Sequence, residues 1–404
     1  MLAILTTHPI QYQVPLWQAL ARDGRVPFEV WYLTDHALHV SHDREFGKAF
    51  AWDINMLEGY PHRFLKTASE ATPGSFWKCR LRESLAERIQ ASGVTALWVQ
   101  GWQVAAYWQA VWGAKQAGIE VWLRAESNAL APAPFWKRRI KQLLLGQFFR
   151  RVDHFLYIGR ANRRLYENYG VPADRLHPAP YAVDNDRFAQ HAARLRPQRA
   201  ALRKQWGVAE DAFCVLFCGK FIPKKRPLDI VAAARQLRES GQLSNIHLLF
   251  VGSGELGDAL RRELQVVFDA ENDSDQPSVK ALDGKCPPAS FAGFLNQTEI
   301  PKAYVVADCL VLPSDHGETW GLVVNEALAS GLPCIVSDAC GCAEDMGRLV
   351  GAEIFKLGRC AELAEGVHRF AKRAAQNPPL CNLHQDFSIQ RTLSTVVGLR
   401  LRSM

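Results

Sequence analysis

The sequence lacks any run of roughly 18 or more apolar residues, so no segment has the composition expected of a membrane-spanning helix. Its first residues, MLAILTTHPIQYQ, contain neither a basic leader nor a small-residue cleavage site, and we therefore expect no secretory signal. An internal repeat at a solenoid period is missing too. These absences argue against an integral membrane protein and a repeat protein, and they favour a cytoplasmic location.

A recognisable metal-binding or redox cysteine motif is also absent. The ten cysteines are scattered, and the closest pair, Cys340 and Cys342, has the spacing Cys-Gly-Cys, which matches no zinc or thiol-redox template. Several others lie inside apolar runs typical of buried strands: Cys214, Cys218, Cys309 and Cys334. Because a buried free cysteine behaves as a small hydrophobe, we predict reduced, structural thiols.

The residues that are plentiful describe a folded globular protein. Hydrophobic residues make up 48% and charged residues 22%, as in ordinary soluble domains. A chain of 404 residues exceeds the roughly 250 to 300 residues that one core usually supports, so two domains are expected. The net charge of +7 is modest but unevenly spread: between Pro134 and Arg164 nine Lys or Arg accompany one acid, Asp153. This asymmetry indicates an anionic partner on one face.

Short apolar strands alternate with amphipathic helices along both halves. Predicted strands are 2–7, 28–34, 96–101, 120–126 and 154–159, then 213–220, 246–254, 290–295, 309–314 and 333–338. Predicted helices include 14–24, 105–118, 227–241 and 300–307. This alternation predicts an α/β fold with two doubly wound parallel sheets. Ligands of such sheets bind outside the carboxyl ends of the strands.

The periodicity fades near residue 190, which gives predicted domains of 1–190 and 191–385. A final helix within 386–404 is expected to pack back toward the first domain. The polar segment 271–288, ENDSDQPSVKALDGKCPP, is interpreted as a solvated surface loop.

Two glycine-containing strand ends in the second half could meet a phosphate. In FCGKFIPKKRPLDIV a strand ends at Gly219, Lys220 follows, and Lys225 stands in the turn before a helix. The segment FVGSGE ends another strand with Gly252 and Gly254. A glycine turn lets ammonium groups and main chain approach an anion. The alternatives are a solvated basic turn and an ordinary tight turn.

The stretch PSDHGETWGLVVNEALASGLPCIVSD carries two glutamates, Glu318 and Glu326, with no basic neighbour in the sequence. Glu318 is predicted in a loop after a strand, and Glu326 within the first two turns of the next helix. Gly321 and Leu322 begin that helix, whose N-terminal N–H groups suit a phosphate. Either glutamate could instead simply favour the helix dipole. That alternative accounts for one carboxylate better than for both.

These segments together resemble the nucleotide-sugar-binding domain of retaining glycosyltransferases of family 4, which have the GT-B fold. The resemblance rests on GETWGLVVNEALASGLPCIVSD, GKFIPKKRPLDI and FVGSGE and covers most of residues 195–400. The first half is similar in architecture, and its segments THPIQYQVPLWQALA, FGKAFAWDINMLEGY and YAVDNDRF resemble bacterial members that build surface polysaccharides.

The resemblance implies a role for each matching position. Glu318 would contact the donor sugar near the reacting carbon, and Lys220 and Lys225 would bind the diphosphate as it departs. Lys220 stands where many members have arginine. A guanidinium group that donates two parallel hydrogen bonds is thus replaced by the single charge of an ammonium group. The residues implied to bind the donor are Gly219, Gly252, Gly254, Phe294, Leu295, Thr319, Trp320, Gly321, Leu322, Val323 and Glu326, with Glu326 on the ribose hydroxyls.

The resemblance makes 1–190 the acceptor-binding domain, but this half departs from the family pattern. The turn after the first strand reads TTHPIQY, with His8 and Gln11 where many relatives have a glycine pair, and a later strand end reads WLRAESN in place of a histidine. His8, Gln11, Arg124 and Glu126 are therefore candidates for the acceptor side. A structural ion pair between Arg124 and Glu126 is the alternative.

The basic, aromatic segment 135–151, FWKRRIKQLLLGQFFRR, has apolar residues at helical spacing. These residues could pack against the sheet, and a surplus of basic and aromatic side chains on a helix also fits an anionic membrane surface. The two interpretations are compatible. Nucleic acid is not expected, because the charge is local and no recognised module accompanies it.

Together these features predict a glycosyltransferase that moves a sugar from a nucleotide-sugar donor, a UDP-sugar, to a glycan or lipid-linked acceptor with retained configuration. No cofactor and no metal are expected, because two lysines and a helix terminus supply positive charge. The protein would be cytoplasmic, with peripheral contact to the inner face of a membrane. A nucleotide-sugar epimerase of similar shape and a non-catalytic sugar-nucleotide-binding scaffold are the alternatives.

Overall fold

The computed structural model describes residues 1–36, 38, 41–43, 48–50, 52–68, 71–132, 134–271, 286–376 and 385–402. The chain divides into two compact units. The first contains Met1–Ser41, Ile54–Val183 and Gln385–Met404, and the second contains His42–Asp53 and Asp184–His384. The chain thus changes unit just before helix α6 (Asn185–Leu195), whereas the periodicity suggested a boundary near residue 190. Most of the predicted loop 271–288 lies outside the described residues.

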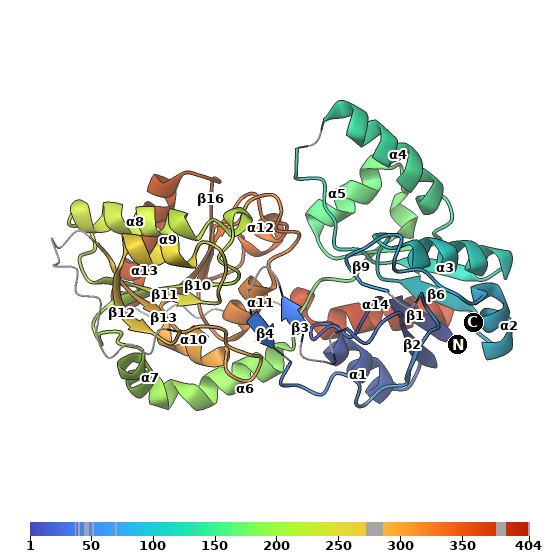
Figure 1. Ribbon diagram of the computed structural model, residues 1–404, viewed down its shortest axis with the longest axis horizontal. Helices are drawn as coiled ribbons and strands as arrows, with labels where there is room; N and C mark the ends of the chain where they lie inside the picture. The colour runs from blue at the N-terminus through green and yellow to red at the C-terminus, as the bar shows by residue number, and fades with distance from the viewer. Residues whose placement is uncertain are drawn as a thin grey trace. The chain divides into compact units, whose positions relative to one another are not determined.

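The first unit is built on a parallel sheet of seven strands (Figure 1). In spatial order they are β5 (His62–Phe64), β2 (Phe28–Tyr32), β1 (Leu2–Thr6), β6 (Ala96–Val99), β7 (Glu120–Leu123), β8 (His154–Tyr157) and β9 (Leu176–Pro178). Its helices are α1 (Val14–Asp23), α2 (Leu85–Ser92), α3 (Ala105–Gln116), α4 (Phe135–Phe149), α5 (Arg160–Asn168) and α14 (Ile389–Arg402), and a 3-10 turn spans Ala173–Arg175.

Both faces of this sheet are buried, as the apolar strand sequences predict. On one face, α2, α3 and the end of α4 pack over strand residues such as Leu97 and Val121. On the other face, Trp17 of α1 meets Trp98 of β6 edge to face, with ring centroids 5.5 Å apart. Helix α14 packs beside α1, and Thr392 Oγ1 donates to Pro180 O at 3.1 Å. The last helix is therefore part of the first unit.

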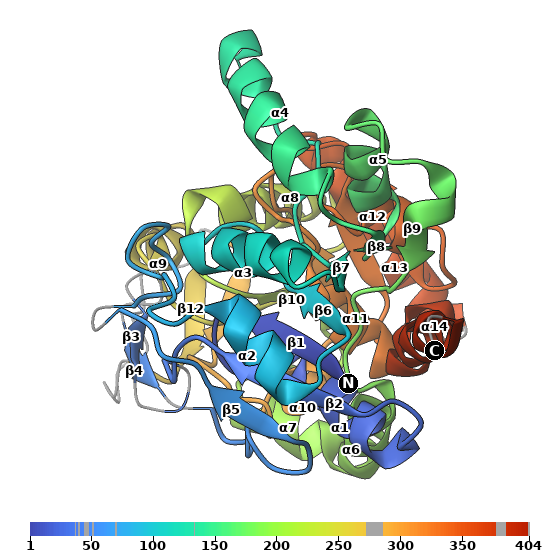
Figure 2. The ribbon, with the colours of Figure 1, turned by 90° about the vertical axis from the view of Figure 1, so that its right-hand side faces the viewer.

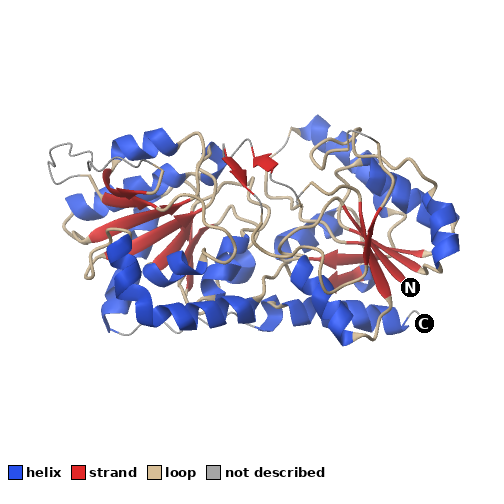
Figure 3. Ribbon diagram, turned by 60° about the horizontal axis from the view of Figure 1, so that its bottom comes forward, coloured by secondary structure: helices blue, strands red, loops and turns tan. Residues whose placement is uncertain are grey.

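The second unit repeats the plan with another parallel sheet of seven strands (Figure 3). In spatial order they are β12 (Gln265–Asp269), β13 (Pro288–Phe291), β11 (Ile246–Val251), β10 (Phe213–Cys218), β14 (Cys309–Leu312), β15 (Cys334–Ser337) and β16 (Ala352–Phe355). The short strands β3 (Ser41–Asp43) and β4 (Lys48–Phe50) form a separate two-stranded sheet. The predicted strand 290–295 ends earlier, because Gly293 takes a left-handed φ of 68°.

Helices cover both faces of the second sheet. One layer holds α8 (Pro227–Glu239), α9 (Gly257–Glu263) and α13 (Cys360–Gln376). The other holds α6, α7 (Arg199–Gln205), α10 (Pro301–Val306) and α11 (Leu322–Ala329). The short α12 (Ala343–Met346) follows β15, and 3-10 turns span Arg196–Gln198, Pro223–Lys225 and, in the first unit, Gln385–Phe387. Phe250 and Phe291, on neighbouring strands, stack with centroids 5.1 Å apart in the core.

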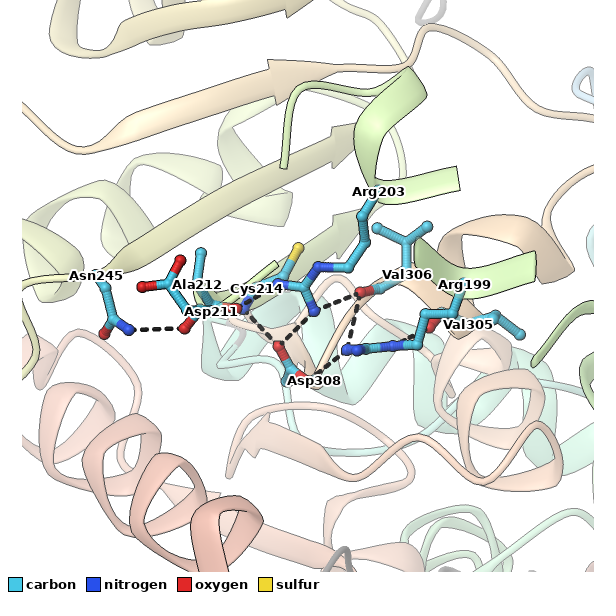
Figure 4. A network of polar contacts seen from close by, with 9 residues as sticks. All are labelled: Arg199, Arg203, Asp211, Ala212, Cys214, Asn245, Val305, Val306 and Asp308. Carbon is cyan, nitrogen blue, oxygen red and sulfur yellow. Dashed lines mark hydrogen bonds and ion pairs between the residues drawn. The ribbon is translucent and has the colours of Figure 1, made fainter. Parts of the chain in front are cut away.

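A charged network holds the amino ends of two central strands in the second unit (Figure 4). Asp308, just before β14, accepts a hydrogen bond of 2.7 Å from Cys214 N of β10 and one of 2.7 Å from Arg199. Arg203, 3% exposed in its side chain, lies 3.4 Å from the same carboxylate and also donates to Ala212 O. The network lies at the sheet edge opposite the carboxyl ends of the strands, so its role is structural.

No helix among the described residues combines the length and the apolar character needed to cross a bilayer.

Candidate functional site

The carboxyl edge of the second sheet is shaped by glycines that allow loops to approach one another. Gly219, Gly252 and Gly254 have φ of 152°, 126° and 149°. A Cβ on Gly252 would lie 2.1 Å from Gly219 O, and one on Gly254 would lie 2.8 Å from Phe221 O. Hydrogen bonds from Gly219 N to Val251 O at 2.9 Å and from Gly252 N to Gly293 O at 2.8 Å join three strand ends. Only glycine fits this arrangement.

The basic turn after β10 is ordered by its own contacts. Lys224 and Lys225 lie in the 3-10 turn, and Arg226, the one described non-glycine residue with positive φ, binds Asp229 through two hydrogen bonds of 2.8 and 3.1 Å. Asp315 N donates to Lys224 O at 2.8 Å, which ties this turn to the loop after β14. The main chain of the turn is therefore held by contacts at the sheet edge, and the side chain of Lys224 is exposed.

Glu318 forms an ion pair with Lys225 of the turn after β10, 93 positions away in sequence. The side chains are 12% and 20% exposed, so the pair is shielded from solvent. The main chain of Glu318 is held by Gly341 N, which donates to Glu318 O at 3.0 Å. Glu318 has no basic neighbour in the sequence, and the fold supplies one from another loop.

Glu326 lies in the second turn of α11 and is 2% exposed. Its Oε2 accepts a hydrogen bond from the hydroxyl of Tyr304 on α10. Burial, with the nearby Glu326 carboxylate, raises the pKa of the Cys218 thiol at the end of β10 to about 12. The second glutamate therefore sits on the same edge as the basic turn and, like Glu318, has a partner that comes from another element.

Helix α11 begins between the two glutamates. Gly321 has φ of 105°, and a Cβ there would lie 2.6 Å from Leu312 Cδ2 of β14, so the glycine lets the helix start directly over the strand end. The first turn contains no acidic residue. The N–H groups of Leu322 and Val323 carry the positive end of the helix dipole, and no carboxylate of that turn offsets it.

The other predicted donor residues follow the same edge. Phe294 and Leu295 come directly after Gly293, next to the glycine loop of β11, and both are partly buried. Trp320 is buried and donates from Nε1 to Asn325 Oδ1 at 2.9 Å, whereas Thr319 is exposed. The structure therefore brings Lys225, Glu318, the start of α11 and the glycine loops to one sheet edge.

Sequence reasoning overlooked Tyr304, Gly293 and the loop at Gly341. Tyr304 belongs to the predicted helix 300–307, whose spacing indicates an apolar face but not which residue meets Glu326. Gly293 interrupts the apolar run SFAGFL, and that interruption was the available signal for a strand end.

The candidate acceptor residues lie in the first unit, after β1 and β7. The ring of His8 lies 6.0 Å from that of His36, and its Nδ1 is 2.9 Å from Thr7 Oγ1. Burial, reinforced by His36, lowers the pKa of His8 to about 4, so the imidazole is neutral at neutral pH. Gln11 follows on the same turn and is partly exposed.

Arg124 and Glu126 both converge on the segment after β9. Arg124, 4% exposed, donates to Ala179 O at 3.4 Å and Pro180 O at 3.3 Å, with its guanidinium 4.9 Å from the ring of Tyr181. The hydroxyl of Tyr181 donates to Glu126 Oε1 at 2.6 Å. These contacts join both residues to residues 179–181.

Among the described residues, no three His, Cys, Asp or Glu side chains are grouped so as to hold a metal ion. The segment Asp184-Asn185-Asp186 has the letters Asp-x-Asp that some metal-dependent transferases use. Asp184, however, caps α6 by accepting a hydrogen bond of 3.0 Å from Arg187 N.

Comparison with known proteins places the chain within a family. The model for glycosyl transferases group 1 matches residues 198–377, and that for a glycosyl transferase 4-like domain matches residues 16–182. The chain is 32% identical over 179 residues to D-inositol 3-phosphate glycosyltransferase of Geodermatophilus obscurus, covering 43% of this chain and 35% of the relative. It is 28% identical over 174 residues to lipopolysaccharide 1,2-N-acetylglucosaminetransferase of Salmonella typhimurium, covering 42% of each. These matches span about a third to two fifths of the relatives' length.

Among solved structures, Anabaena HepE in complex with UDP has a TM-score of 0.68 at 17% identity over 100% of both chains. The two seven-stranded parallel sheets and this likeness define the class as the GT-B fold, which confirms the predicted fold. Within that class, the chain belongs to the group 1 glycosyl transferases, of family 4 type.

Proposed function

We propose that this protein transfers a glycosyl group from a nucleotide-sugar, a UDP-sugar, to a hydroxyl group of a glycan or lipid-linked acceptor, with retention of configuration and without a metal or cofactor. The observation that carries this proposal is the Lys225–Glu318 pair beside the N-terminus of α11, with Glu326 in that helix. These groups match the parts of a sugar nucleotide. The cation and the helix terminus suit the diphosphate, Glu318 suits the sugar, and Glu326 suits the ribose.

The diphosphate is assigned to the positive groups. Lys220 and Lys225 supply ammonium charge, and the amides of Leu322 and Val323 supply the helix terminus. Charge develops on the leaving diphosphate in an oxocarbenium-like transition state, so donors held in advance at this position lower the barrier.

The Lys225–Glu318 ion pair couples diphosphate binding to sugar binding. A diphosphate competes with Glu318 for Lys225, and when the ammonium group turns to phosphate it releases the carboxylate for the hydroxyl groups of the sugar. Glu326, oriented by Tyr304, would accept hydrogen bonds from the ribose hydroxyls.

In the proposed reaction, the bond between the anomeric carbon and the diphosphate oxygen breaks and its electron pair leaves with the diphosphate. The acceptor oxygen forms the new bond to the anomeric carbon, and its proton passes to the departing diphosphate. Two names among the similar proteins support the substrate classes: HepE was solved with UDP, and the Salmonella relative is named for transfer to lipopolysaccharide.

The test begins with a thermal-shift screen of nucleotide-sugars, since a ligand that binds only the folded state raises its melting temperature. With the donor found, we expect Lys225→Ala to lower the rate of transfer or of donor hydrolysis by about 10² to 10³. Glu318→Gln should also lower the rate, yet tighten UDP binding in calorimetry, because it removes the carboxylate that competes for Lys225.

Lys224→Ala is the matched control, since it removes a lysine from the same turn and should change activity only slightly. Wild-type activity in both Lys225→Ala and Glu318→Gln would overturn the site assignment. Exchange of deuterium from solvent into the donor without acceptor would instead indicate an epimerase, and UDP binding without any turnover across a broad acceptor panel would indicate a scaffold.

A further inference from the structure

Helix α4 presents a second apolar face that the core of the first unit does not use. Leu145, Phe148 and Phe149 near its end are buried against the sheet. Five large apolar residues nearer its start remain exposed, with exposed fractions of 52% to 74%: Phe135, Trp136, Ile140, Leu143 and Leu144. At about 100° per residue, four of these (Trp136, Ile140, Leu143 and Leu144) fall in one arc, which does not overlap the arc of the buried residues. Figure 2 shows the helix extending away from the sheet.

A separate loop adds the same kind of side chains beside this face. Residues 76–80 read FWKCR and residues 135–139 read FWKRR, so the letters Phe-Trp-Lys occur in both segments. Trp77 is 76% exposed, and its ring lies 4.8 Å from that of Phe76. Phe76 and Trp136 line one groove of about 390 Å³, which Trp102 and Trp108 also line. The two segments therefore form one continuous aromatic surface, which we call the Phe-Trp face.

Basic residues accompany both segments of the Phe-Trp face. Lys141 lines the same groove, and exposed Arg80 and Arg82 follow the first segment. On the other flank of α4, a second groove of about 510 Å³ is lined by Arg139, Arg150 and Arg175. No Asp or Glu is among the described residues that line either groove.

The single acid of the segment 134–164 does not offset this charge. Asp153 forms an ion pair with Lys115 of α3 and accepts a hydrogen bond from Val121 N at 2.8 Å. The surface around α4 is therefore both apolar and positively charged.

We propose that the Phe-Trp face docks on the surface of an anionic lipid bilayer. Trp and Phe side chains enter the boundary between headgroups and acyl chains, and basic residues at its rim bind anionic headgroups. A second copy of this chain is a poorer occupant, because a symmetric pairing of the face would oppose like charges. Nucleic acid would meet exposed aliphatic residues such as Ile140 and Leu143, which offer no contact to phosphate. The proposal does not rest on the function proposed above.

The test is sedimentation of the full chain with vesicles of phosphatidylcholine alone and of an equal mixture with phosphatidylglycerol. The wild type should bind the mixed vesicles at least about tenfold more tightly than the neutral ones, and added salt should weaken this binding. The double variants Trp77→Ser/Trp136→Ser and Arg139→Glu/Lys141→Glu should each bind at least about tenfold more weakly.

Two controls match these variants on the second unit: Val350→Ser, at an apolar residue exposed by 70%, and Lys204→Glu/Arg262→Glu, at exposed basic residues. Both should bind mixed vesicles as the wild type does. The proposal is overturned by equal affinity for the two vesicles, by absence of binding at low salt, or by wild-type binding in both double variants. A dimer without vesicles that Trp77→Ser/Trp136→Ser dissociates would also overturn it, because the face would then be covered by a second copy.

Discussion

His247 is a buried imidazole in the second unit whose protonation is opposed by the fold. It is 2% exposed, and its Nε2 lies 2.8 Å from Ser290 Oγ. Because Ser290 donates its own hydrogen to Trp206 O at 2.5 Å, the serine oxygen accepts from Nε2–H. Burial, with Arg203 nearby, lowers the pKa of His247 from 6.5 to about 4. The folded state therefore favours the neutral ring.

The sign of the pH effect follows from this pKa. Between pH 6.5 and 4 the unfolded chain binds a proton that the folded chain does not, so the free energy of unfolding falls as the pH falls. By about pH 4, this difference in proton binding at His247 has lowered the free energy of unfolding by ~3 kcal/mol. In denaturant titrations, His247→Gln should show a shallower loss of stability across this range than the wild type. Parallel profiles would contradict the assignment.

Glu318 and Lys225 show why single residues of the candidate site were easier to find than their partnerships. The spacing of Glu318, Gly321 and Glu326 in one short stretch was enough to mark them as candidates. The ion pair was not foreseeable from that stretch, since it joins the loop after β14 to the turn after β10. Tyr304 was missed for the same reason, because a helix pattern does not indicate which side chain meets a neighbouring helix.

The loop after β11 is closely restricted by the main chain of its neighbour. Gly252 has φ of 126°, and the position of a Cβ there lies 2.1 Å from the carbonyl oxygen of Gly219. The strain of positive φ therefore adds to a collision with main chain, which cannot turn aside as a flexible side chain does.

We expect Gly252→Ala to destabilise the protein by more than ~2 kcal/mol and to weaken UDP binding, because the loops after β10 and β11 must separate. Gly241→Ala is the matched control: its φ is 70°, and nothing lies within 4 Å of the added Cβ, so only the strain of about 1 kcal/mol applies. Urea unfolding and calorimetry measure the two effects. Equal losses in both variants would show that the close approach to Gly219 is unimportant.

Element positions followed from periodicity more reliably than element ends. Ten strands of the two sheets and helices α1, α3, α8 and α10 lie where alternation and helical spacing predicted them, whereas the short outer strands β5, β9, β12 and β16 were not predicted. Helix α4 fits the packed-helix interpretation only in part, because its last apolar residues are buried and its first apolar residues are exposed. Periodicity identifies an apolar side chain but does not reveal whether the fold provides a surface to cover it.

In the molecule as a whole, a stabilising charged network and the candidate site lie at opposite edges of the second sheet. The network of Asp308, Arg199 and Arg203 joins the amino ends of β10 and β14, whereas the candidate site lies at their carboxyl ends. Loss of Asp308 would leave the buried Arg203 without its carboxylate, a change that typically costs about 3 to 5 kcal/mol.

Asp308→Ala should therefore lower the free energy of unfolding by ~3 kcal/mol while the folded protein still binds UDP normally at low temperature. Asp211→Ala is the control, because Asp211 is exposed and contributes only its carbonyl oxygen, which accepts from Asn245 at 2.7 Å. Thermal unfolding and calorimetry separate the two quantities. A selective loss of UDP affinity in Asp308→Ala without loss of stability would refute this division.

Local spacing and residue type were enough to predict the alternation of strands and helices, two parallel sheets and the cluster of Glu318, Gly321 and Glu326. Three contacts depend on the folded chain: Lys225 pairs with Glu318, Tyr304 binds Glu326, and the two Phe-Trp-Lys segments share one groove. Each of these contacts joins positions far apart in the chain, and a one-dimensional pattern does not specify which strand ends a parallel sheet brings together.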